Sequence, residues 1–131
     1  MSEIRIRNKK NNPVTDILIG LLIGTGVFMV FLCLSALVIT KVQINSNYLF
    51  IFIIISSAIS SLFTSFYTSH VTNKNKLIFG VASSVILILM HFIIILCFNN
   101  SNLALKTYLI FPADVITALI GAISGINLFR K

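Results

Sequence analysis

Four long apolar segments alternate with short polar segments along the chain of 131 residues. The apolar segments cover about residues 17–40, 48–70, 77–98 and 108–129. Each reaches the roughly 20 residues that an α-helix needs to cross the hydrocarbon core of a bilayer. We therefore predict an all-α fold, a four-helix transmembrane bundle that forms one domain over residues 17–131. Residues 1–16, which are basic and polar, are expected to form a disordered cytoplasmic tail.

The composition favours the same conclusion, because 57% of the residues are hydrophobic and only 10% are charged. A soluble domain uses roughly 25% charged residues to cover its surface, so a lipid bilayer is the expected partner of this exterior. The net charge of +7 would suggest nucleic acid in a soluble protein. Here the basic residues lie in the tails and connections without a nucleic-acid-binding motif, so we expect no nucleic acid partner.

The distribution of Lys and Arg predicts the orientation in the membrane. One side of the predicted bundle carries eight of them, namely Arg5, Arg7, Lys9, Lys10, Lys74, Lys76, Arg130 and Lys131. The other side carries only Lys41 and Lys106. Since positive charge is retained in the cytoplasm, we predict a multi-pass protein of the plasma membrane with both termini inside the cell.

Small residues mark the expected contact faces, because transmembrane helices associate through small side chains and polar contacts. The first segment carries a GxxxG motif, and the third and fourth segments each place small residues on one face at helical spacing. The predicted packing residues are Gly20, Gly24, Gly80, Ser84, Gly121 and Gly125. An antiparallel pairing of segments three and four would place Gly80 opposite Gly125 and Ser84 opposite Gly121.

The same pairing brings two ionisable residues, His91 and Asp114, to the same depth. Ionisable groups within a membrane usually face the bundle interior and have a partner, so we predict that His91 and Asp114 form a polar pair. Two alternatives stay open. Asp114 could cap a fourth helix that begins at Pro112, and His91 could donate one hydrogen bond to a neighbouring helix. Whether the pair only packs or also handles protons is likewise open.

Hydroxyl side chains form two rows at four-residue steps along the inner half of the second segment. The residues concerned are Ser57, Ser61, Ser65 and Ser69 in one row, and Ser56, Ser60, Thr64 and Thr68 in the other. One interpretation is a packing surface whose hydroxyls bond to backbone carbonyls. The other interpretation is the lining of a water-filled path.

Motifs for catalysis, cofactors or metals are missing from the sequence. There is no HExxH, GxSxG, P-loop or GxGxxG pattern and no cluster of Cys and His, so we expect no enzyme activity, no cofactor and no metal site. Cys33 and Cys97 lie inside apolar segments. We expect two buried thiols that pack as small hydrophobic side chains, with a disulfide between them as the alternative.

Three short stretches, "GLLIG" in the first segment, "FGVASS" in the third and "GAISGINLFRK" at the end, resemble the YrzE-like family. The members of this family are small, uncharacterised four-helix membrane proteins of Gram-positive bacteria. The resemblance covers most of the chain after the basic tail. It implies a plasma-membrane location and the same topology, and it implies no activity.

The function expected from these features is structural or partner-binding, through helix–helix packing with a second copy of the chain or another membrane protein. The alternative is a subunit of an oligomeric small transporter or channel. Its inner path would be lined by the Ser and Thr rows, and Asp114 and His91 would be its polar elements.

The predicted orientation can be tested with reporter enzymes fused after Lys131. A reporter that is active only in the cytoplasm should be active in this fusion, because the basic residues near the C-terminus stay inside. A second reporter that is active only outside the cell should be inactive at the same position. Activity of the external reporter alone would contradict the orientation.

Overall fold

The computed structural model describes residues 12–45, 48–98 and 108–128, and these residues form four α-helices. The helices are α1 (Pro13–Val42), α2 (Leu49–Val71), α3 (Lys76–Phe98) and α5 (Ile110–Asn127). Each contains a stretch long and apolar enough to cross a membrane. The predicted all-α class with four membrane-spanning helices is therefore confirmed, and these helices contact the lipid bilayer.

The first helix begins earlier than the hydrophobic pattern predicts. Pro13 lies in its first turn, where the missing N–H of proline costs no hydrogen bond. Asp16 follows in the same turn, where the helix dipole favours a carboxylate. The expected tail, residues 1–16, is therefore too long, because α1 already includes its last four residues. Residues 1–11 and the third connection, 99–107, lie outside the described residues.

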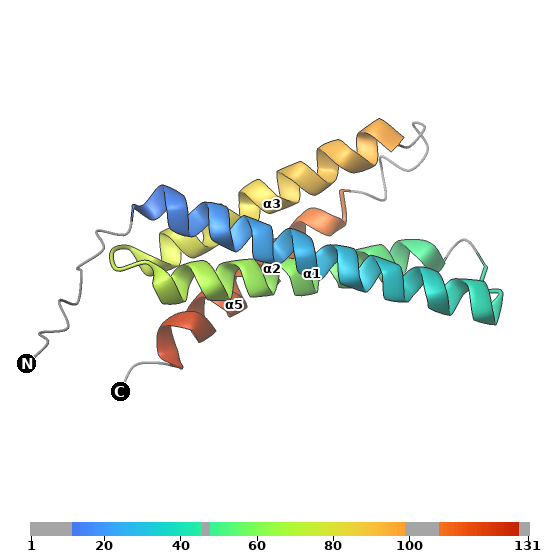
Figure 1. The fold of residues 1–131 in the computed structure, drawn as a ribbon, viewed down its shortest axis with the longest axis horizontal. Coiled ribbons are helices and arrows are strands. Elements are labelled where there is room, and N and C mark those ends of the chain that lie inside the picture. The colour runs from blue at the N-terminus through green and yellow to red at the C-terminus, as the bar shows by residue number, and fades with distance from the viewer. Residues whose placement is uncertain (1–11, 46–47, 99–107, 129–131) are drawn as a thin grey trace, which may run out of the picture.

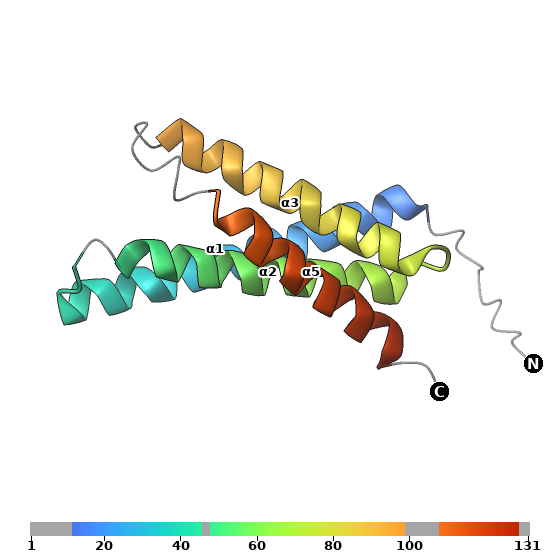
Figure 2. The same ribbon diagram turned by 180° about the vertical axis from the view of Figure 1, so that it is seen from behind.

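Helix α2 lies at the centre of the molecule. Figure 1 shows α1 in front of α2, and the opposite view in Figure 2 shows α5 in front of it. Helix α3 also contacts α2, so that three helices pack around one. The start of α1 and the end of α5 lie at the same end of the molecule, next to the turn between α2 and α3 (Figure 1). A chain that crosses the membrane four times ends on the side where it began, so the two ends are expected to lie together.

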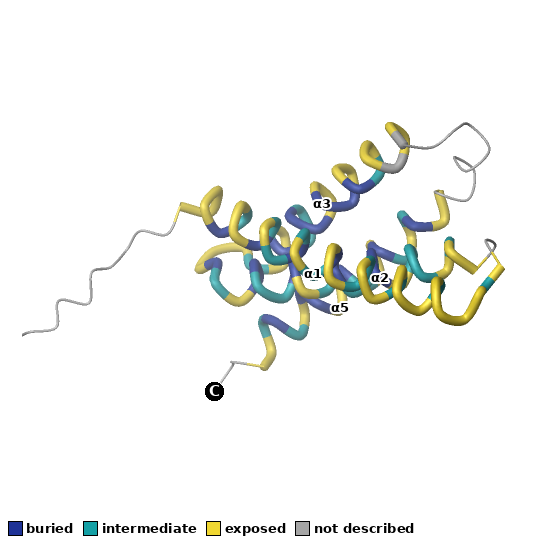
Figure 3. Tube along the Cα trace, turned by 45° about the vertical axis from the view of Figure 1, so that its right-hand side comes forward, coloured by how far each residue is buried: buried dark blue, intermediate teal, exposed yellow. Residues whose placement is uncertain are grey.

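The buried residues are mostly polar and the exposed residues are mostly apolar. Among the described residues, eleven hydroxyl side chains are buried, namely Ser56, Ser57, Ser60, Ser61, Thr64, Ser65, Thr68, Ser69, Thr72, Ser83 and Ser84. Large apolar side chains such as Leu22 and Ile116 point outward. Figure 3 shows the exposed positions along the outer sides of the helices. This distribution fits a bilayer, since lipid tails solvate Leu and Ile as well as a protein core does.

All five glycines of the predicted packing set lie against α2. A Cβ atom built on Gly121 would lie 2.5 Å from the backbone oxygen of Leu62, and one on Gly125 would lie 2.5 Å from that of Phe66. Three further glycines lie where a Cβ would overlap hydroxyl side chains of α2. These are Gly20 at Thr68, Gly24 at Thr64 and Gly80 at Ser69.

Helices α3 and α5 contact each other, as expected for segments three and four, but their small residues lie against α2 rather than opposite one another. Gly80 lies against Ser69 rather than opposite Gly125, and Ser84 donates a hydrogen bond to the backbone oxygen of Ser61. The sequence identifies the small faces of α3 and α5. It does not identify their partner, because α2 presents hydroxyls on a wider arc than one neighbouring helix covers.

Replacing Gly121 with Ala should lower the stability of the protein by about 1–3 kcal/mol, because the added methyl group would overlap the backbone of α2. The matched control is Gly26→Ala, which adds the same methyl group where no atom lies within 4 Å. This control should unfold at the temperature of the parent protein or slightly above it. Thermal unfolding of both variants in one detergent measures the difference. Equal stability would contradict close packing of α5 on α2.

Candidate functional site

One row of hydroxyls on α2 faces α5. The Ser57 hydroxyl donates a hydrogen bond to Asp114 Oδ2, and the Ser65 hydroxyl donates to the backbone oxygen of Ala118 at 2.6 Å. Between them, Ser61 Oγ lies 2.7 Å from Thr117 Oγ1. Residue numbers increase together along both helices at these contacts, so α2 and α5 run parallel.

The end of this row and the second row serve the other two helices. The Ser69 hydroxyl donates to the backbone oxygen of Lys76 at 3.0 Å, where α3 begins. In the second row, the Ser60 hydroxyl donates to the backbone oxygen of Gly24 in α1 at 2.7 Å. Thr64 and Thr68 bond to carbonyls of their own helix, one turn earlier.

None of the hydroxyls proposed to line a path faces open space. Their residues have exposed fractions of 0–2%, and each hydroxyl has a hydrogen-bond partner within the protein. The residues are Ser57, Ser61, Ser65, Ser69, Thr64 and Thr68. This geometry is that of a packing surface between helices.

Asp114 lies in the interior of the bundle, with an exposed fraction of 0%. Because α5 begins at Ile110, two residues before Pro112, Asp114 comes after the first turn, and the first turn holds no acidic residue. The helix-capping alternative therefore does not describe Asp114. Its Oδ2 accepts the hydrogen bond of Ser57, whereas its Oδ1 has no hydrogen-bond partner among the described residues.

His91 is also buried, with an exposed fraction of 4%, and it faces α1. Its ring stacks on Phe28 with a centroid distance of 3.9 Å and an interplanar angle of 26°. Neither ring nitrogen has a hydrogen-bond partner in the described part of the chain. The hydrogen bond expected between His91 and Asp114 is thus not formed. Ser57 of α2 occupies the position next to the carboxylate, and the imidazole ring is held against α1.

The two ionisable residues nevertheless lie at similar depths. The hydrogen bond from Ser84 to Ser61 sets the register of α3 on α2, and one turn further along both helices Ile88 comes level with Ser57. His91 follows three residues later, a rise of about 4.5 Å. Since Ser57 is bonded to Asp114, the imidazole and the carboxyl group are separated by roughly one helical turn in depth.

These residues define a buried polar site, which consists of Ser57, His91 and Asp114, with Phe28 stacked on the imidazole. Four helices contribute one residue each. A carboxyl and an imidazole group can each bind and release a proton. Among the described residues no group of three or more His, Cys, Asp or Glu is arranged to hold a metal ion.

Two buried residues of α1 were not predicted from the sequence, namely Phe28 and a second carboxylate, Asp16, whose exposed fraction is 4%. Both lie on the α1 face that contains Gly20 and Gly24. The sequence feature that identifies them is a series of four-residue steps, from Asp16 through Gly20 and Gly24 to Phe28. Extending the GxxxG motif by one turn in each direction would have identified them.

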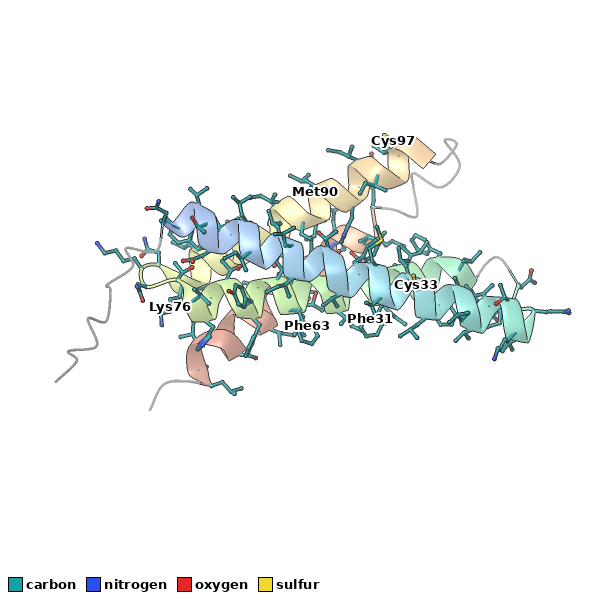
Figure 4. All side chains as sticks on the ribbon, in the orientation of Figure 1. Phe31, Cys33, Phe63, Lys76, Met90 and Cys97 are labelled. Atoms are coloured by element: carbon teal, nitrogen blue, oxygen red, sulfur yellow. The ribbon has the colours of Figure 1, made fainter. Side chains whose placement is uncertain are left out.

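Cys33 and Cys97 do not match the expectation of buried thiols or of a disulfide. Both are free and exposed on the outside of the helices. Figure 4 shows Cys33 on α1 and Cys97 near the end of α3, well separated. A thiol is small and weakly polar, so a lipid-facing position is acceptable for it.

Comparison with protein-family models matches residues 13–127 to the family described as Protein of unknown function (DUF3792). The match covers all four helices, so the chain belongs to this family. No curated protein and no solved structure matches the chain. The family description does not include the YrzE-like name, and that finer resemblance stays a prediction.

Replacing Ser57 with Ala should destabilise the protein by about 1–3 kcal/mol, because it leaves Asp114 Oδ2 buried without a donor. Ser35→Ala is the matched control. The Ser35 hydroxyl bonds only to the backbone oxygen of Phe31, one turn earlier in α1. Its loss should change the free energy of unfolding by less than 1 kcal/mol. Denaturant titration of both variants provides the comparison, and equal losses would argue against the bond from Ser57 to Asp114.

Proposed function

We propose that this member of the DUF3792 family is a structural or partner-binding membrane protein that acts through helix–helix packing and catalyses no reaction. The support comes from its interior. The glycines and hydroxyls that promote helix association are used within the chain, where they hold one four-helix unit together. Such a unit presents a fixed exterior to other membrane proteins.

The proposal includes a location in the plasma membrane with both termini in the cytoplasm. The excess of Lys and Arg in the tails and in the second connection supports this orientation. The helix ends support it further, since α1 begins and α5 ends at the same end of the molecule (Figure 1).

The observation that carries the proposal is the position of Gly26. Of the six glycines, it is the one at which an added Cβ would meet no atom within 4 Å. A glycine on a helix surface costs about 1 kcal/mol relative to alanine. In membranes, small residues offset this cost where another helix approaches closely. Gly26 thus supports a contact with a helix from outside the chain.

The residues around Gly26 on the same side of α1 are exposed. Met29 and Val30 have exposed fractions of 59% each, and Cys33 follows Gly26 by seven residues, about two helical turns. We name this surface the α1 outer face, consisting of Leu22, Gly26, Met29, Val30 and Cys33. We assign a second copy of the chain as its partner, because a small residue at the centre of such a face allows two identical helices to approach closely.

A second candidate function is that of a subunit of an oligomeric transporter or channel. The observation in its favour is the buried polar site, where His91 and Asp114 retain polar atoms without a partner among the described residues. Its test is flux driven by a pH gradient in liposomes that contain the protein. Flux that is lost in Asp114→Asn would support transport, and absence of flux from the parent protein would contradict it.

Self-association through the α1 outer face can be tested with the natural cysteines. In a Cys97→Ser variant, Cys33 is the one remaining thiol. Mild oxidation in membranes should convert much of the protein to a disulfide-linked dimer. Gly26→Leu in this background should reduce the dimer several-fold by separating the helices, whereas Gly26→Ala should retain most of it. An equal amount of dimer in Gly26→Leu and Gly26→Ala, or no dimer in either the parent or the variants, would contradict the proposed partner.

A further inference from the structure

Three buried polar atoms of the polar site have no hydrogen-bond partner in the part of the chain that the structure describes. They are Asp114 Oδ1 and the two ring nitrogens of His91. The fourth such atom in the described residues, Thr72 Oγ1, lies beyond the end of α2 and away from this site. Buried polar groups are nearly always paired in folded proteins. Unpaired atoms on two groups whose depths differ by about one helical turn therefore point to a species bound between them.

The charged and polar groups around Asp114 restrict which species can be bound there. Helix α2 faces it with Ser57 and Ser61, which are neutral, and α3 contributes His91. At the level of the site, α1 contributes Phe28, which is stacked on the imidazole. On α5 itself, Asp114 is the one charged residue.

The thiols of Cys33 and Cys97 lie about 8 Å beyond Phe28 and about 9 Å beyond His91 along their helices, but both are exposed on the outside. The other titratable groups of the described helices lie far from this level. Along α1, Asp16 precedes Phe28 by about 18 Å, and Lys41 follows it by about 20 Å. Along α2, Tyr67 and His70 follow Ser57 by about 15 and 20 Å. Along α3, Lys76 precedes His91 by about 22 Å. Among the residues that the structure describes, no basic side chain other than His91 is therefore close enough to neutralise Asp114.

An ionised carboxylate with one hydrogen bond is strongly disfavoured in an apolar interior. Two states avoid this situation. Either Asp114 is protonated, or it is ionised and His91 carries the balancing proton. Both states contain one more proton than an ionised Asp114 beside a neutral His91.

We propose that Asp114 and His91 form a buried site that binds one shared proton together with bridging water. The hydrogen bond from Ser57 occupies Oδ2 and leaves Oδ1 as the oxygen that is available to accept a further hydrogen bond. Stacking on Phe28 fixes the plane of the imidazole ring. A water molecule needs two to four polar partners to stay in a protein interior. Asp114 Oδ1 and a ring nitrogen of His91 supply two of them.

This inference goes beyond the proposed function, because a packing role requires no bound proton. It also differs from transport, since a site can hold a proton without passing it across the membrane. The bound species is a proton with its water, and the groups that recognise it are one carboxyl and one imidazole. Loss of self-association through the α1 outer face would leave this inference unaffected.

The shared proton can be tested by infrared spectroscopy on the full chain in lipid nanodiscs at neutral pH. The protein has only three acidic side chains, so assignment by substitution is simple. A carbonyl band of a protonated carboxylic acid should be present, vanish in Asp114→Asn and persist in Asp16→Asn, the control for another buried carboxylate. His91→Phe, which keeps an aromatic ring against Phe28, should shift the band.

Nitrogen NMR of His91 in the same nanodiscs completes the test. If no protonated carboxyl band is found, the ring nitrogens should report an imidazolium, because the shared proton then resides on His91. An ionised Asp114 together with a neutral imidazole would overturn the proposal. A carboxyl band that is unchanged by His91→Phe would overturn the sharing between the two residues. The Asp114→Asn variant retains the shape of the carboxyl group, so that its spectrum reports on the proton rather than on unfolding.

Discussion

Hydrogen bonds from serine hydroxyls to the backbones of neighbouring helices hold this protein together. In a bilayer, Leu gains nothing by leaving lipid for protein, so close packing and polar contacts must supply the attraction between helices. Helix α2 provides most of them, through Ser60 to α1, Ser65 to α5 and Ser69 to α3. The glycines of the other three helices allow the backbones to approach closely enough for these short side chains to reach.

The buried polar site is a continuation of the same contact. Along the α2 row that faces α5, Ser65 and Ser61 donate to backbone oxygens of Ala118 and Asp114, and one turn further on Ser57 donates to the Asp114 side chain. A carboxylate oxygen thus takes the place of a backbone carbonyl as the acceptor. Because Ser57 bonds to Oδ2, the other carboxylate oxygen, Oδ1, has no hydrogen-bond partner among the described residues. Packing and proton binding are in this way properties of one surface.

Much of the fold could be predicted from the sequence, because each span is a long apolar run with polar residues at its ends. The faces that pack were also visible, since Gly121 and Gly125 or Gly20 and Gly24 recur at helical spacing. The helix that each face contacts was not visible from the sequence, because small residues show where another backbone approaches but not which helix it belongs to. His91 and Asp114 have matching depths in the sequence, but the register alone does not reveal that Ser57 lies beside the carboxylate.

The central claim is that serine hydroxyls bonded between helices stabilise the protein more than those bonded within a helix. The triple variant Ser60→Ala, Ser65→Ala, Ser84→Ala removes three bonds between helices. The triple variant Ser35→Ala, Ser56→Ala, Ser83→Ala removes three hydroxyls that bond within their own helix. Their free energies of unfolding in the same bicelles provide the comparison. The first variant should lose roughly 2 kcal/mol more than the second, and equal losses would contradict the account.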